Sequence, residues 1–280
     1  MLSSFISDPN SLDRNLGMEL VRVTEAAALA GGLWAGRGDK NGVDGAAVRA
    51  MRDTLDTVNL SGTVIIGEGE KDKAPMLANG EKVGNGQGPK VDVAVDPIDG
   101  TRQCAEGRPT AISVMAISAA GSMYDPSAFY YMKKIATGPE AADVIDVDAS
   151  VEDNIRNVAQ AKQKSVRDIT VVVLDRPRHD DLQAAIREAG AKVRLIADGD
   201  VAGAVAAAKH GNSVDLMMGI GGTPEGVITA AAMRCLGGAI QGRLWPKTDE
   251  EIARAATGEY DTDKVLYTND LLSLIHISEP

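Results

Sequence analysis

One stretch of sequence constrains the fold of this chain more than any other: residues 91–102, which read VDVAVDPIDGTR. Its three valines alternate with polar or small residues, which is the period of a half-buried β-strand. Pro97 then fixes its own backbone and lacks an N–H, and Gly100 permits a sharp turn. The sequence therefore predicts a strand that ends in a rigid turn.

This turn carries side chains that suit a metal ion. Asp96, Asp99 and Thr101 would leave the end of the strand together, and carboxylate oxygens are preferred ligands of Mg²⁺ and Mn²⁺. Asp, Pro and Gly are also ordinary turn residues, so the six residues DPIDGT alone leave a plain β-turn open.

The composition limits the partners of the chain. It has 280 residues, enough for one large domain or two smaller ones, and a formal net charge of −11. This charge disfavours nucleic acids and anionic membranes as partners, but metal ions and a few cationic side chains can neutralise the charge of a phosphate substrate locally.

Cys104 and Cys235 fit neither a metal-ligand spacing nor a disulfide framework, so we expect a cytoplasmic protein. We expect no signal peptide and no membrane span, because no suitable apolar run is present.

The part of the chain before this strand is predicted to hold two helices and a short strand. Apolar residues at helical spacing indicate a helix over residues 13–31 and a second one that begins at Asp44. Asp44 would ordinarily be a helix cap or a first-turn acid. A short strand over residues 63–66 leads into GEGEKD, which contains Glu68 and Asp72. Such a run is commonly a solvated loop, although its glycines would let carboxylates approach a ligand.

The second half of the chain alternates strands and helices from residue 168 onward, which is typical of an α/β sheet. Strands are predicted at 170–174, 192–196 and 214–218, and each leads into a loop rich in charged residues or glycine. In open α/β sheets, ligands bind beyond the carboxyl ends of the strands. The change of pattern places a subdomain boundary near residue 165.

These loops suit an anionic ligand, although each feature has an ordinary interpretation too. Arg176 and Arg178 could clamp a phosphate or form surface ion pairs. Residues 219–225, GIGGTPE, would open a helix with backbone N–H groups that bind anions, while Glu225 could equally be a first-turn helix acid. Tyr131 could bond a sugar or a phosphate, or be a half-buried strand tyrosine.

Five acids share one kind of position, at a strand end or at a helix start. They are Asp44, Glu68, Asp96, Asp99 and Glu225. A site for two or three divalent cations needs converging carboxylates of this kind, and such cations polarise a phosphoryl group and activate a water. With the basic residues nearby, the pattern indicates hydrolysis of a small phosphate ester.

The sequence closely resembles the class II (GlpX-type) fructose-1,6-bisphosphatases of bacteria over about residues 16–270. The resemblance rests on long motifs that occur in the family's order: VTEAAALAG, GRGDKN with DGAAV, GTVIIGEGEKDKAPML, VDPIDGTR, YMKKIA, DRPRHD, DGDVAGA, GIGGTPEGVI and AAMRCLGG. The segment DPIDGT alone would indicate only the wider superfamily of metal-dependent sugar and inositol phosphatases.

The resemblance implies a layered α-β-α-β-α sandwich of the metal-dependent sugar and inositol phosphatase type. It implies that Mg²⁺ or Mn²⁺ supports release of the 1-phosphate of fructose 1,6-bisphosphate in gluconeogenesis, giving fructose 6-phosphate. A broader sugar bisphosphatase that also accepts sedoheptulose 1,7-bisphosphate, an inositol-phosphatase-like enzyme and an inactive sugar-phosphate-binding fragment stay open as alternatives. We expect a homo-oligomer whose partner is a small-molecule sugar bisphosphate, with no nucleic-acid or membrane partner.

By motif, the resemblance also assigns roles to individual residues. The metal ligands would be Asp44, Glu68, Asp96, Asp99 and Glu225, and many relatives carry Glu at the position of Asp99. The substrate contacts would be Asp99, Gly100, Thr101, Tyr131, Arg176, Pro177, Arg178, Asp198, Gly199, Asp200 and Gly222. Thr101 would orient the attacking water, with Lys40 and Asp72 as supporting catalytic residues.

We expect two subdomains and a tail. Residues 1–165 would form an N-terminal metal-binding phosphatase subdomain, and residues 166–270 a C-terminal α/β sugar-phosphate-binding subdomain that is incomplete. Family-like sequence ends at Asp270, and residues 271–280 read LLSLIHISEP. We expect these last residues to be a non-native tail.

Overall fold

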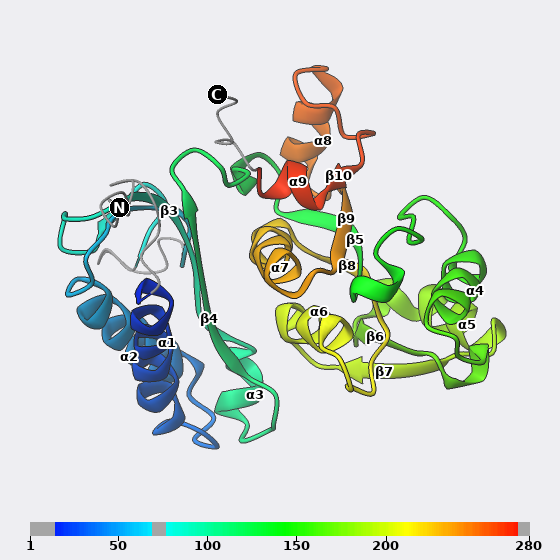
Figure 1. Ribbon diagram of the computed structural model, residues 1–280, viewed down its shortest axis with the longest axis horizontal. Coiled ribbons are helices and arrows are strands. Elements are labelled where there is room, and N and C mark those ends of the chain that lie inside the picture. The colour runs from blue at the N-terminus through cyan, green and yellow to red at the C-terminus, as the bar shows by residue number, and fades with distance from the viewer. Residues whose placement is uncertain (1–14, 69–76, 274–280) are drawn as a thin grey trace, which may run out of the picture. The chain divides into compact units, whose positions relative to one another are not determined.

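A computed structural model of the chain describes residues 15–68 and 77–273, which divide into two compact units (Figure 1). The first unit ends at Met123, and the second spans Tyr124–Ser273. Within the described ranges, no helix combines the length and the apolar character needed to cross a bilayer.

The division between the units lies earlier in the chain than the boundary expected near residue 165. Strand β5 (Tyr131–Thr137) is the reason, because it pairs on both sides with strands of the second unit. Its partners are β8 (Leu216–Gly222) and β9 (Ala239–Leu244). The segment before residue 165 therefore supplies a central strand to the second sheet.

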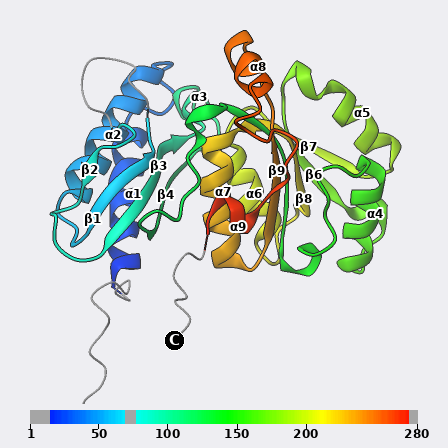
Figure 2. The same cartoon turned by 90° about the horizontal axis from the view of Figure 1, so that it is seen from above.

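The first unit is a four-stranded sheet with helices against it. Its strands lie in the order β2-β1-β3-β4, and β1 and β3 are parallel while the outer pairs are antiparallel. Helices α1 (Leu16–Gly32) and α2 (Lys40–Leu55) cover one face of the sheet (Figure 2). The strands are β1 (Ser61–Ile66), β2 (Lys82–Val83), β3 (Lys90–Asp99) and β4 (Ile112–Ala119).

Helix α1 confirms the predicted first helix, whereas α2 begins earlier than the sequence pattern indicated. Asp39 caps α2, since its side chain accepts a hydrogen bond of 2.9 Å from the N–H of Gly42. Asp44 therefore lies inside the helix, and its interpretation as a cap is wrong. The Asp44 side chain is consequently not engaged in capping this helix.

Strand β3 is more buried than its alternating sequence indicated. Residues on both of its faces are buried, including Asp92, whose exposed fraction is 4%. The Asp92 carboxylate accepts hydrogen bonds from the backbone N–H groups of Ser122 and Met123, at 2.9 and 3.1 Å. The fold tolerates a carboxylate at this buried position because two backbone N–H groups donate hydrogen bonds to it.

The second unit is a six-stranded mixed sheet with helices on both faces. Its strands lie in the order β10-β9-β5-β8-β6-β7, and β6 is parallel to both β7 and β8. Helices α6 and α7 lie against one face, and α4 and α5 against the other (Figure 2). The elements not yet given are α4 (Val151–Ala161), β6 (Thr170–Leu174), α5 (Asp180–Glu188), β7 (Lys192–Ile196), α6 (Asp200–Ala208), α7 (Thr223–Leu236), α8 (Asp249–Ala256), β10 (Leu266–Tyr267) and α9 (Thr268–Leu271).

The predicted α/β class is confirmed. The strands predicted at 170–174 and 192–196 coincide with β6 and β7, and the strand predicted at 214–218 is present as β8, which continues into the glycine-rich segment. The two units together contain the helix and sheet layers of the predicted sandwich. Each unit has its own apolar core, around Met51 and Val93 in the first and around Ile155 and Leu216 in the second.

The described part of the expected tail is packed against the second unit. Leu271 is fully buried, and its carbonyl oxygen accepts a hydrogen bond of 3.0 Å from the N–H of Tyr124. Arg234 Nε donates to the carbonyl oxygen of Leu272 at 3.0 Å. The rest of the expected tail lies outside the described residues.

Candidate active site

The end of β3 carries a β-bulge that changes the direction of its side chains. In the pairing of β3 with β4, Asp96 lies opposite Val114 and Asp99 lies opposite Ile112. Three steps along β3 thus correspond to two along β4. Because residues that lie directly opposite each other share a face, Asp96 and Asp99 point to the same side of the sheet. In a regular strand, residues three apart would point to opposite sides.

Thr101 joins this strand end to helix α2. Its hydroxyl oxygen lies 2.8 Å from Asp44 Oδ1 and 3.0 Å from the carbonyl oxygen of Ile98. The residue begins the short helix α3 (Thr101–Ala105), after Gly100 in the left-handed region at φ 92°. Thr101 has one proton to donate, so its oxygen keeps lone pairs that can accept a hydrogen bond from a water.

Cys104 lies close to these groups but is unsuited to nucleophilic catalysis. The thiol is buried, and its sulfur lies 3.7 Å from the carbonyl oxygen of Gly31. Burial raises the pKa of Cys104, and the negative charge of Asp44 raises it further. A cysteine nucleophile needs a lowered pKa, so phosphoryl transfer to this thiol is disfavoured.

The other predicted site residues of the first unit are Glu68, Lys40 and Asp72. Glu68 is half-buried in the loop that follows β1, and Lys40 is the exposed first residue of α2. Asp72 lies outside the described residues. Over residues 15–68 and 77–273, no group of three or more His, Cys, Asp and Glu side chains is close enough to hold a metal ion. Four of the five predicted ligands belong to the first unit, and Glu225 belongs to the second.

In the second unit, Arg178 is bound to the backbone of β8. Its Nε and Nη2 donate to the carbonyl oxygen of Ile220 at 3.1 and 2.7 Å. Its guanidinium carbon also lies 5.3 Å from the ring centroid of Tyr131, a cation–π distance. Arg178 forms no ion pair within the part of the chain that the structure describes. The surface ion-pair interpretation of this arginine is therefore not favoured.

His179 bonds to the backbone N–H of the same residue, Ile220. Its Nε2 accepts a hydrogen bond of 2.7 Å from the N–H of Ile220, and its Nδ1 lies 2.8 Å from the carbonyl oxygen of Leu174. These partners assign the proton to Nδ1. Burial lowers the pKa of His179, and the charges of Arg178 and Arg176 lower it further. The ring is thus a neutral link between β6 and β8.

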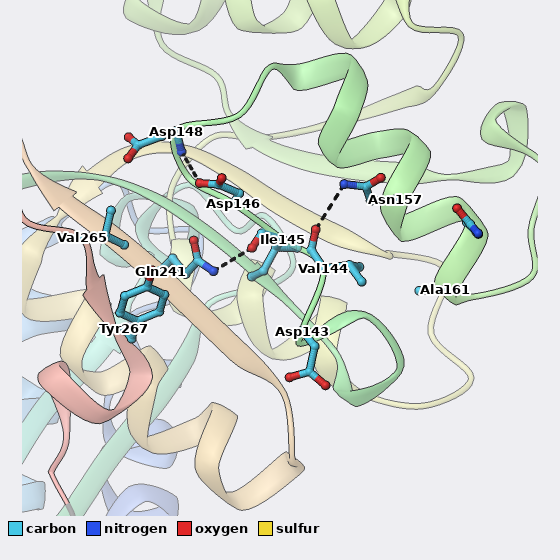
Figure 3. Close-up of a pocket in the computed structure, with 11 residues that line it drawn as sticks. Asp143, Val144, Ile145, Asp146, Asp148, Asn157, Ala161, Gln241, Val265 and Tyr267 are labelled. Atoms are coloured by element: carbon cyan, nitrogen blue, oxygen red, sulfur yellow. Dashed lines mark hydrogen bonds between the residues drawn. The ribbon is translucent and has the colours of Figure 1, made fainter.

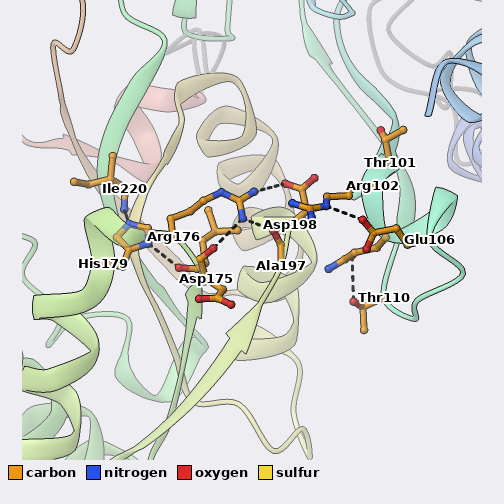
Figure 4. A network of polar contacts seen from close by, with 12 residues as sticks. Thr101, Arg102, Glu106, Thr110, Asp175, Arg176, His179, Ala197, Asp198 and Ile220 are labelled. Carbon is orange, nitrogen blue, oxygen red and sulfur yellow. Dashed lines mark hydrogen bonds and ion pairs between the residues drawn. The ribbon is translucent and has the colours of Figure 1, made fainter. Parts of the chain in front are cut away.

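Arg176 contacts the loop that precedes α6 (Figure 4). Its Nη1 donates to the carbonyl oxygens of Ala197 and Asp175 at 2.6 and 2.9 Å, and its Nη2 lies 3.4 Å from Asp198 Oδ1. Gly199 follows in the left-handed region at φ 82°. The loop that holds Asp198 is therefore fixed by one arginine side chain.

Asp200 is held by a lysine that the sequence patterns did not single out. Lys134 Nζ lies 2.9 Å from Asp200 Oδ2, with side-chain exposures of 1% and 7%. The same ammonium group donates to the carbonyl oxygen of Gly222 at 2.9 Å. Lys134 thereby connects β5, α6 and the end of β8. The signal for it was the alternation of Met132, Lys134 and Ala136, which places the lysine on a buried face of its strand.

Gly222 and Glu225 approach each other at the start of α7. A Cβ atom built on Gly222 would lie 1.7 Å from Glu225 Oε2, so a glycine is required for this carboxylate to adopt its position. Glu225 lies in the first turn of α7 and is half-buried.

A cluster of aromatic and cationic side chains surrounds Tyr131. Tyr130 and Trp245 make edge-to-face contacts with its ring, at centroid distances of 4.8 and 6.1 Å. Lys247 Nζ lies 4.8 Å from the same ring centroid. Neither Trp245 nor Lys247 was a predicted site residue, because no local motif marks them.

Glu251 connects the two backbone segments of this cluster. Its carboxylate accepts hydrogen bonds from the N–H groups of Tyr130, Lys247 and Thr248, at 2.8, 2.9 and 3.1 Å. Burial disfavours its charge, but the three N–H donors and Arg254 outweigh that effect and hold the pKa of Glu251 below its ordinary value.

A pocket of about 980 Å³ lies elsewhere in the second unit (Figure 3). None of the predicted site residues lines it. Three aspartates do, at positions 143, 146 and 148, and no lysine or arginine is among its lining residues. Several of its polar groups already bond to one another, as Gln241 does to the carbonyl oxygen of Ile145. The lining of this pocket therefore offers a phosphate ester no cation.

Comparisons with known proteins agree with the family resemblance. The family model described as "Bacterial fructose-1,6-bisphosphatase, glpX-encoded" matches residues 14–277. Fructose-1,6-bisphosphatase 1 class 2 of Escherichia coli strain K12 is 45% identical over 271 residues, covering 92% of this chain and 80% of that protein. Fructose-1,6-bisphosphatase class 2 of Escherichia coli O6:H1 and that of Shigella flexneri match with the same identity and coverage.

Proposed function

The chain belongs to the family of bacterial, glpX-encoded fructose-1,6-bisphosphatases, and from this membership we propose that it hydrolyses fructose 1,6-bisphosphate. The products are fructose 6-phosphate and inorganic phosphate, and the reaction would serve gluconeogenesis in the cytoplasm. The names of the matched relatives do not favour a sedoheptulose bisphosphatase or an inositol phosphatase. The single observation that best supports the chemistry is the bulged strand end, where Asp96 and Asp99 share a face.

The residues present suit the divalent cation of a metal-dependent phosphatase, and we propose Mg²⁺ or Mn²⁺. The donor set consists of hard carboxylate oxygens, from Asp44, Glu68, Asp96, Asp99 and Glu225. Mg²⁺ is commonly held by one or two carboxylates together with waters and substrate phosphates, which two acids on one face of a strand can supply. Bound there, the cation would polarise the phosphoryl group and lower the pKa of a water.

Thr101 and Asp44 would move the proton of the attacking water. The Thr101 hydroxyl donates to Asp44 Oδ1 across 2.8 Å, which leaves its oxygen able to accept from a water. As the water attacks phosphorus, its proton passes to Thr101 while the Thr101 proton passes to Asp44. Lys40 and Asp72 are proposed as supporting residues.

The second unit would hold the sugar and the phosphate that does not react. The Arg178 guanidinium lies against the Tyr131 ring, and its charge is not neutralised by an ion pair among the described residues. Arg176, Pro177 and the loop of Asp198, Gly199 and Asp200 would complete the contacts of this unit, with Gly222 next to them. Gly100 of the first unit is proposed as a further substrate contact.

The test is phosphate release by the purified protein. We expect turnover of fructose 1,6-bisphosphate with Mg²⁺ or Mn²⁺ and none after chelation, and slower turnover of sedoheptulose 1,7-bisphosphate and inositol phosphates. Asp96→Asn should reduce kcat by roughly 100-fold or more, because a cation ligand is lost. Metal titration followed by calorimetry should show weaker cation binding in this variant.

A matched control is Asp53→Asn, which removes the same charge from an exposed position of α2. It should retain the wild-type rate. Release of phosphate at equal rates with and without chelator would contradict the proposed function, as would full activity in Asp96→Asn.

A further inference from the structure

Two cationic side chains approach a single tyrosine ring in the second unit. The guanidinium carbon of Arg178 lies 5.3 Å and Lys247 Nζ lies 4.8 Å from the ring centroid of Tyr131. Like charges repel each other, so two cations beside one ring have an electrostatic cost, which the attraction of each cation to the ring opposes. Such a pair is stabilised when an anion binds to both cations.

The structure describes no carboxylate that neutralises these cations. Neither Arg178 nor Lys247 takes part in an ion pair among residues 15–68 and 77–273. The chain as a whole carries a net charge of −11, so acidic partners are plentiful elsewhere. Two cations beside one ring, neither of them in an ion pair among the described residues, form a locally positive site in a negatively charged protein.

The position of Lys247 is fixed by its backbone. The N–H of Trp245 donates to the carbonyl oxygen of Tyr131 at 2.9 Å, which extends the pairing of β5 and β9 toward Lys247. Glu251 then accepts from the N–H groups of both Lys247 and Tyr130. One buried carboxylate thus holds the backbone beside the ring and the backbone of the lysine together. The lysine side chain itself is exposed and can reach a ligand.

We propose that Lys247 is a substrate-binding residue that contacts, together with Arg178, the phosphate group that is not cleaved. This inference rests on the proposed bisphosphatase function. A phosphate monoester carries about −1.5 to −2 charges at pH 7, which matches two cations. The site would therefore favour sugar bisphosphates over sugars that carry only the reacting phosphate.

The experiment compares Lys247→Met with the wild type in steady-state kinetics and product inhibition. Fructose 6-phosphate carries only the retained phosphate, so its inhibition constant reports on this subsite. We expect KM for fructose 1,6-bisphosphate and the inhibition constant of fructose 6-phosphate each to rise about tenfold, with kcat nearly unchanged. Lys247→Arg, which keeps the charge, should restore both constants to within a few fold of the wild-type values.

The control is Lys192→Met, which removes the same charge from the first residue of β7, at the strand end opposite to the predicted binding loops. It should leave both constants unchanged, which separates a local contact from an effect of net charge. Unchanged constants in Lys247→Met, or equal changes in both lysine variants, would overturn the assignment of Lys247. A wild-type protein that releases no phosphate from any sugar phosphate would instead refute the proposed function.

Discussion

At the scale of single residues, the backbone of Ile220 shows how side chains can fix a main chain. The N–H of Ile220 donates to His179 and its carbonyl oxygen accepts from Arg178, so the two peptide groups that flank Ile220 are each held by one of two adjacent residues. The arrangement needs a neutral imidazole, because a protonated Nε2 could not accept from an N–H. The structural role of His179 therefore depends on its protonation state.

We predict that His179 makes the stability of the fold depend on pH. Its pKa in the folded protein lies below the value of about 6.5 of an unfolded chain, so the unfolded state binds more protons between these two values. Stability should be fully present above about pH 7 and fall as the pH decreases through 6.5, by up to about 1.4 kcal/mol per pH unit. Urea denaturation between pH 8 and pH 5 measures this slope.

Replacing His179 with Gln should reduce the slope, and replacing the exposed His210 with Gln should not. A slope that is the same in the wild type and in His179→Gln would show that other groups cause the pH dependence.

The sequence could predict some of these residues because their signal is local. Asp96, Asp99 and Thr101 lie within six positions of one another, in a motif whose chemistry can be read directly. Lys134 and Lys247 could not be found that way. Lys134 meets Asp200 and Gly222 across the fold, and Lys247 reaches Tyr131 only because β5 and β9 are paired.

At the scale of secondary-structure elements, the junctions between strands and helices carry most of the candidate site. Gly222 is the clearest example, since it ends β8 and precedes α7. A Cβ atom there would overlap the carboxylate of Glu225, and the carbonyl oxygen of the same residue accepts from Lys134. The junction therefore requires a residue without a side chain at position 222.

We predict that Gly222→Ala displaces the Glu225 carboxylate and lowers kcat by at least about tenfold, while the far-UV circular dichroism is retained. The cation concentration that gives half-maximal activity should rise, because a proposed ligand has moved. Gly17→Ala is the control: position 17 lies in α1 with no heavy atom within 4 Å of the added Cβ, so helix stability should increase slightly. Wild-type metal dependence in Gly222→Ala would contradict the proposed role of Glu225.

The strand and helix patterns predicted the presence of most elements but not their irregularities. The bulge in β3 depends on its register with β4, which no property of residues 96–99 alone determines. The early start of α2 depends on Asp39, whose capping bond to Gly42 competes with the loop that the glycine-rich sequence favours. In each case the local sequence permits both the predicted and the observed backbone, and contacts with other residues decide between them.

At the scale of the whole molecule, each unit has its own apolar core. Met51 and Leu55 are fully buried in the first, and Ile155 and Ile186 are fully buried in the second. The sequence predicted an α/β chain with a change of pattern, but it could not assign β5 to the second unit. That assignment depends on pairing with strands that lie roughly 80 to 110 residues later in the chain.

We predict that Ile155→Ala destabilises the second unit by about 2–5 kcal/mol, the usual range for removing a buried side chain of this size. Hydrogen exchange should show reduced protection in Tyr124–Ser273 first. Leu195→Ala is the control, because Leu195 is an exposed residue of the same sheet and its loss should change stability by only about 0.5 kcal/mol. Equal destabilisation by the two substitutions would show that the core around Ile155 is not a separate source of stability.

The Glu251 carboxylate also has a consequence for the order of folding. Its hydrogen bond to Tyr130 joins residues 121 positions apart in the chain. Closing so long a loop costs conformational entropy that grows with the logarithm of its length, and one hydrogen bond contributes only about 1 kcal/mol. We therefore expect the bond to form with, or after, the pairing of β5 and β9. An intermediate with a completed sheet but an unformed Glu251 contact would not yet bind a sugar phosphate, so ligand affinity would be acquired in one of the last steps of folding.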